Sequence, residues 1–98
     1  MKLVVREEAA DDLGGIFDWI AKDSVSSAAS VVRALRERMN SVLLPELVNI
    51  GRPGRREGTR ELVEWPYIIV YKADDNRQVV TILAVVHGET TLNIRRIA

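Results

Sequence analysis

An almost unbroken run of apolar residues near the C-terminus places the strongest constraint on the fold. Residues 78–87 read Gln-Val-Val-Thr-Ile-Leu-Ala-Val-Val-His. The run is shorter than the roughly 20 residues that a membrane-spanning helix needs, and its β-branched side chains favour a strand. A strand that is apolar on both faces is usually buried on both. We therefore expect helices to cover one face, and either residues 90–98 or a partner chain to cover the other.

Two amphipathic helices, joined as a helical hairpin, are expected before this strand. Residues 7–22 and 26–43 each repeat one apolar stripe at helical spacing. The stripe residues are Ala9, Leu13, Ile16, Phe17 and Ile20 in the first helix, and Ala28, Val31 or Val32, Leu35, Met39 and Val42 in the second. Gly14 and Gly15 lower helix propensity. Either something packs closely against the backbone there, or the well-buried stripe tolerates them.

Three shorter strands complete the predicted fold. They cover residues 2–6, 59–65 and 67–73, and the polar residues 74–77 form a turn. The basic, glycine-rich segment that ends at Arg56 is expected to be an irregular loop. The element order is β-α-α-β-β-β. We expect one α+β domain over residues 1–98, with an antiparallel sheet, the N-terminal helical hairpin packed on one face, and a variable tail at 89–98.

Charge and composition argue against several classes of function. Fourteen Lys and Arg residues balance fourteen Asp and Glu residues, so the chain lacks the overall basic charge of a nucleic-acid-binding protein. With no cysteine and one histidine, it cannot build a disulfide framework, a cysteine zinc site or a multi-histidine metal centre. We expect no metal, no cofactor, no membrane contact and no sequence-specific DNA binding. The N-terminus is too weakly apolar for a signal peptide, so a cytoplasmic location is expected.

Four short motifs follow one another along the chain. They are Ala9-x-x-Asp12-Leu13 with Trp19-Ile20, Gly51-Arg-Pro-Gly54 leading to Gly58-Thr-Arg-Glu-Leu-Val63, Tyr67-Ile-Ile-Val-Tyr71, and Ile82-Leu-x-Val-Val-His-Gly88. Each motif is weak alone, but the ordered set resembles the RelE/ParE superfamily of bacterial type II toxins over about residues 3–88. The resemblance implies a toxin that a cognate antitoxin protein neutralises, and that arrests growth when free.

The superfamily has two main activities, and the resemblance leaves both open. ParE-like members bind and inhibit DNA gyrase without chemistry of their own, whereas RelE-like members cut mRNA on the ribosome. A third possibility is an inactive relative that only binds an antitoxin. The ParE-like activity is expected here, with plasmid stabilisation as the associated role, and the chain is then not an enzyme.

RNA cleavage needs a group that activates the ribose 2′-hydroxyl, cations that stabilise the transition state, and an acid for the leaving oxygen. RelE-like enzymes supply these from their middle strands and the end of the last strand. By resemblance only Arg60 and His87 remain as candidates here, because Glu61 stands where a cation is expected. The alternatives are an ion pair from Arg60 to Glu57 or Glu64 and a structural role for His87.

Several exposed residues are candidates for binding the antitoxin or the target. Arginine forms planar, bidentate contacts that suit a protein interface. Trp65, at a strand end beside Pro66, is a better candidate for an exposed anchor than Trp19, and both are more typical of packing. The candidate binding residues are Arg52, Arg55, Arg56, Arg60, Trp65, His87, Arg95 and Arg96.

Overall fold

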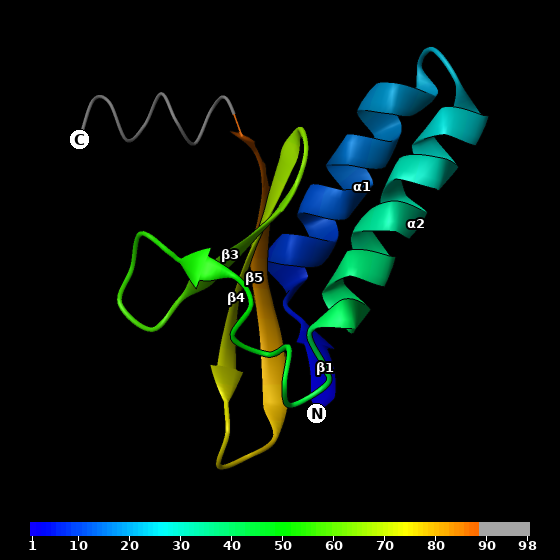
Figure 1. Cartoon of the computed structure of the whole chain (residues 1–98). Helices are drawn as coiled ribbons and strands as arrows, with labels where there is room; N and C mark the ends of the chain where they lie inside the picture. The colour runs from blue at the N-terminus through cyan, green and yellow to red at the C-terminus, as the bar shows by residue number, and fades with distance from the viewer. Residues whose placement is uncertain (89–98) are drawn as a thin grey trace.

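The computed structural model describes residues 1–88, which form an α+β fold with two helices on one side of a five-stranded sheet (Figure 1). The predicted fold class and the amphipathic character of both helices are confirmed. In chain order the elements are β1 (Lys2–Val5), α1 (Glu7–Ala21), α2 (Val25–Ser41), β2 (Arg52–Pro53), β3 (Arg60–Glu64), β4 (Tyr67–Asp74) and β5 (Val79–His87). Residues 89–98, and with them Arg95, Arg96 and the predicted tail, lie outside the described residues.

The sheet has the order β1-β5-β4-β3-β2 and is mixed, not wholly antiparallel. The strands β2 to β5 pair antiparallel, as expected, but β1 lies parallel to β5. Tight turns force antiparallel pairing, whereas a strand separated from its neighbour by other elements is free of that constraint. Both helices stand between β1 and the rest of the sheet in the chain, so no turn sets the direction of β1.

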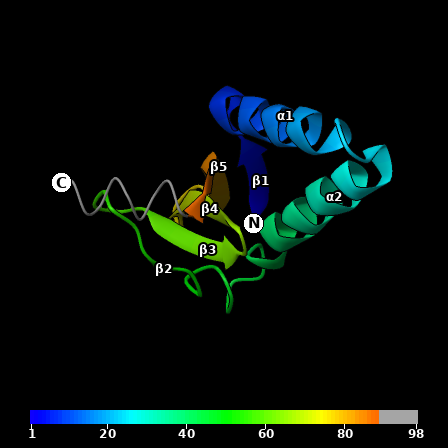
Figure 2. The same ribbon diagram turned by 90° about the horizontal axis from the view of Figure 1, so that it is seen from above.

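The two helices lie against one face of the sheet (Figure 2), and most residues of their predicted stripes are buried or partly buried there. The shared core contains Ala9, Leu13, Leu35, Met39, Val42, Val48, Leu62, Ile69, Tyr71, Val80, Ile82 and Val85. Ser24 caps α2 by accepting a hydrogen bond from the Ser27 amide at 3.1 Å, which satisfies one free amide of the first turn. A Cβ at Gly14 or Gly15 would meet no atom of another part of the chain within 4 Å, so of the two explanations for these glycines the close contact is ruled out within the described residues.

The last strand, β5, contains a β-bulge at Leu83. Val70 pairs with Ala84, but the next residue of β4, Tyr71, pairs with Ile82, so Leu83 is an extra residue. An extra residue shifts the inward-facing positions by one. The residues facing the helices are therefore Val80 and Ile82 before the bulge and Val85 after it.

Hydrogen bonds from the buried side chain of Tyr71 join the segment between α2 and β3 to the sheet. The hydroxyl of Tyr71 donates to the Val48 carbonyl at 2.8 Å and accepts from the Gly51 amide at 3.1 Å. The segment was predicted to be wholly irregular, but Arg52 and Pro53 form the short edge strand β2. A strand of two residues is too short to leave a periodic pattern in the sequence.

Within residues 1–88 no helix is long and apolar enough to cross a membrane. The same residues contain no group of three or more His, Asp or Glu side chains placed to hold a metal ion.

Candidate functional site: the open face of the sheet

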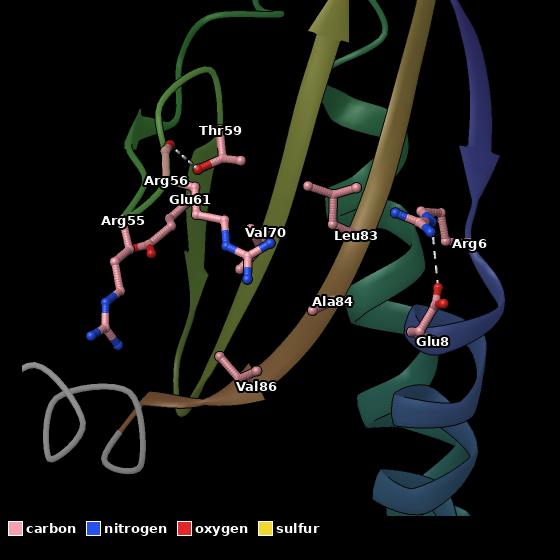
Figure 3. A pocket seen from close by; sticks show the side chains of 10 residues that line it. All are labelled: Arg6, Glu8, Arg55, Arg56, Thr59, Glu61, Val70, Leu83, Ala84 and Val86. Atoms are coloured by element: carbon pink, nitrogen blue, oxygen red, sulfur yellow. Dashed lines mark hydrogen bonds and ion pairs between the residues drawn. The ribbon is translucent and has the colours of Figure 1, made fainter.

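The face of the sheet opposite the helices carries apolar side chains that no described helix covers. Leu83, Ala84 and Val86 of β5, together with Val70 of β4, lie on the floor of a hollow of about 690 Å³ (Figure 3). All four are half-buried, and on neighbouring strands of the same face Val4 and Val63 are exposed. We call this surface the open face. The prediction that the helices bury one face of the last strand is confirmed. The covers predicted for the other face, residues 90–98 or a partner chain, lie outside the described residues.

Arginines stand at both rims of the hollow. Arg6, at the start of α1, lies on one rim and pairs with Glu8 at 3.4 Å, while Arg55 and Arg56 lie on the other rim, in the β2–β3 loop (Figure 3). The Arg56 side chain extends over the floor toward Val70. These arginines are exposed. An apolar floor with a charged rim is the anatomy of a protein-binding surface.

Glu61 belongs to the same hollow and is the one charged residue among residues 1–88 that is buried, at 4% exposed. Its Oε1 accepts a hydrogen bond from Nε of Arg52 at 3.0 Å. A buried carboxylate is tolerated when it is paired and hydrogen-bonded. Glu61 is not among the binding residues predicted from the sequence. The side of the sheet on which Glu61 lies could have been predicted, because neighbouring residues of a strand face opposite sides. Glu61 directly precedes Leu62, which faces the helices.

Arg60 lies on the helix side of the sheet, where its guanidinium donates hydrogen bonds to backbone carbonyls of the same chain. Its Nη1 donates to the carbonyls of Asn49 at 3.2 Å and Gly51 at 2.9 Å. This bonding to backbone replaces the predicted ion pair with Glu57 or Glu64. Glu64 pairs with Arg38 instead, at 3.8 Å.

His87 lies at the other end of the sheet from Arg60. Arg60 of β3 pairs with Tyr71 of β4, whereas His87 of β5 pairs with Tyr67 of β4. The two pairing positions on β4 are four residues apart, and β4 lies between the strands of Arg60 and His87. Four residues of strand span roughly 13 Å. The His87 ring makes an edge-to-face contact with Tyr67, with centroids 5.7 Å apart, beside Asp11 and Asp12. The two residues predicted for a nuclease site are therefore not brought together.

Both tryptophans are exposed, at 70% for Trp19 and 66% for Trp65, which does not fit the packing role expected for both but agrees with Trp65 as a candidate for an exposed anchor. Trp19 lies on α1 beside the hollow that Tyr67 and His87 line. Trp65 lies in the β3–β4 turn, where its ring would be 3.1 Å from a Cβ on Gly88. Of the predicted binding residues, the structure places Arg55 and Arg56 at the open face, and Arg52 reaches it through Glu61.

Comparison with known proteins gives matches over most of the chain. The profile of a family described as "ParE toxin of type II toxin-antitoxin system, parDE" matches residues 3–92. A Sinorhizobium fredii protein named "Putative toxin Y4kP" is 36% identical over 75 residues, which are 74% of this chain and 73% of that protein.

Solved structures show the same fold. A chain of the chromosomal ParDE TA system from P. aeruginosa has a TM-score of 0.76 at 23% identity, covering 89% of this chain and 95% of that one. A chain of the toxin-antitoxin complex RelBE2 from Mycobacterium tuberculosis has a TM-score of 0.64 at 27% identity, covering 88% of each chain.

Proposed function

This chain belongs to the ParE toxin family of type II toxin-antitoxin systems, and from that membership we propose that it arrests growth by inhibiting DNA gyrase and is silenced by a cognate antitoxin. In this proposal it acts in the cytoplasm by binding and is not an enzyme. The single observation that carries the antitoxin part of the proposal is the open face, which combines an apolar floor with arginines on both rims.

The open face is the proposed antitoxin site. Leu83, Ala84 and Val86 stay half-exposed although the sheet has packed its other side, and exposed apolar patches rimmed by polar residues mark sites of protein binding. Related structures support a protein partner, because the M. tuberculosis relative was solved as a toxin-antitoxin complex.

The choice of gyrase over ribosomal mRNA rests on the separation of Arg60 from His87. The groove beside His87 contains the carboxylates of Asp11 and Asp12, which repel a phosphate. Arg60 is bonded to backbone carbonyls at the far end of the sheet. Both observations favour inhibition by binding over cleavage of RNA.

The proposal is tested with purified protein in two parallel assays. We expect the free chain to inhibit supercoiling of plasmid DNA by gyrase, and to leave ribosome-bound message intact. Cleavage of ribosome-bound message, abolished in the His87→Ala variant, would establish the nuclease alternative and remove the gyrase proposal. Normal growth on expression without the antitoxin would support the third possibility, an inactive antitoxin-binding relative.

A further inference from the structure

A second groove lies on the helix side of the sheet, where α1 passes the end of β5 that β1 does not cover. Its volume is about 430 Å³, and its walls include Asp11, Asp12, Gly15 and Trp19 of α1 and Tyr67 and His87 of the strands. The α1 residues follow one another on one side of the helix, at spacings of three or four residues. We call this surface the α1–β5 groove.

The aromatic wall of the groove is already in contact with a cation. Nζ of Lys22 lies 4.9 Å from the centroid of the Trp19 ring, within the range of a cation–π interaction. Lys22 is exposed. A cation from another molecule can therefore replace it, or approach the opposite face of the ring.

The acidic wall of the groove is fixed in place. Oδ2 of Asp12 accepts a hydrogen bond from the Val85 amide at 2.9 Å, in the part of β5 that lies beyond the pairing with β1. Asp11, its neighbour, is exposed. Gly15 lies between the acids and Trp19, and a Cβ there would meet nothing within 4 Å, so the helix backbone itself is accessible.

The charge of α1 determines which ligand fits. The helix contains five carboxylates, Glu7, Glu8, Asp11, Asp12 and Asp18, and no basic residue. An anionic ligand is repelled by such a helix, whereas a basic one is attracted both by the carboxylates and by the indole ring. Arginine suits both walls, because its planar guanidinium stacks on aromatic rings and binds carboxylates.

We propose that the α1–β5 groove binds a basic segment of a protein partner, with one arginine on Trp19 and a second at Asp11. Trp19 comes eight positions after Asp11 along the helix, a rise of about 12 Å. Two basic residues three positions apart in an extended peptide lie about 10 Å apart, so such a spacing fits the two walls. The site is separate from the open face and does not depend on the proposed function.

The test uses the full chain labelled with ¹⁵N and the peptide acetyl-Ala-Arg-Ala-Ala-Arg-Ala-amide. We expect the peptide to shift the indole resonance of Trp19 and the amide of Gly15, with the amides of Val70 and Leu83 on the open face unchanged. The Trp65→Phe variant assigns the indole signal to Trp19. The control peptide, in which neutral citrulline replaces both arginines, should shift nothing.

Matched variants separate a site from a general attraction to an acidic helix. Asp11→Asn and Trp19→Leu should each weaken binding by about two- to fivefold, measured at the Gly15 amide. Asp18→Asn removes the same charge from the same helix outside the groove and should leave binding unchanged. Equal weakening by Asp11→Asn and Asp18→Asn, equal shifts with the citrulline peptide, or no shift at all would overturn the proposal. The spectra themselves report that each variant is folded.

Discussion

The two faces of β5 are built from equally apolar side chains but have different surroundings. Val80, Ile82 and Val85 are buried under the helices, while Leu83, Ala84 and Val86 line a hollow that no described helix covers. The bulge at Leu83 shifts the inward-facing positions by one, so that Val85 and not Ala84 follows Ile82 under the helices. The apolar residues of a strand therefore do not all belong to the hydrophobic core. One face holds the fold together, and the other is the surface that we propose for the antitoxin.

Replacing Ile82 should have the largest effect on stability. Its side chain is fully buried, and truncating such a residue to alanine costs roughly 2–5 kcal/mol through lost burial and the cavity left behind. We expect Ile82→Ala to lower the free energy of unfolding by that amount in denaturant titrations. Leu83→Ala, one residue further along, is the matched control, and a comparable loss there would show that the open face is part of the core.

Replacing Leu83 by a charged residue should separate binding from folding. Leu83→Asp places a carboxylate on the floor of the hollow, where a partner would have to bury it, and leaving a charge unpaired in an interface costs several kcal/mol. We expect at least a hundredfold weaker antitoxin binding by calorimetry, with an unfolding midpoint close to that of the wild type. Undiminished binding would move the antitoxin to another surface.

Removing the hydroxyl of Tyr71 should test whether its hydrogen bonds hold the segment between α2 and β2 against the sheet. Tyr71→Phe keeps the buried ring but leaves the Val48 carbonyl and the Gly51 amide without this partner. Unsatisfied buried groups cost about 1–3 kcal/mol. We expect a loss of stability in that range and faster hydrogen exchange at Gly51. Unchanged exchange at Gly51 would mean that the hydroxyl does not hold the loop.

Periodicity and turn chemistry were enough to predict both helices, β3 to β5 and the helix-covered face, because each of these depends on residues close in the chain. The parallel placement of β1 and the bulge at Leu83 depend on contacts between distant segments, which leave no local pattern. The same reason applies to the site. Arg55 and Arg56 could be predicted as binding residues from their place in a basic, turn-rich loop. The hydrogen bonds from Arg60 to the carbonyls of Asn49 and Gly51 could not be predicted.

The exposed side of α1 should show the smallest effect, and one of opposite sign. Gly14 lies on that side, and a Cβ there would meet no atom within 4 Å. Glycine within a helix is less favourable than alanine by roughly 0.5–1 kcal/mol, because it loses more backbone entropy on folding. We therefore expect Gly14→Ala to raise the free energy of unfolding by that amount. Gly51→Ala, in the segment before β2, is the contrast at a buried glycine, since its Cβ would come within 2.7 Å of the Tyr71 hydroxyl and should destabilise the chain. A destabilising Gly14→Ala would indicate that a close contact, absent here, forms on the outer side of α1.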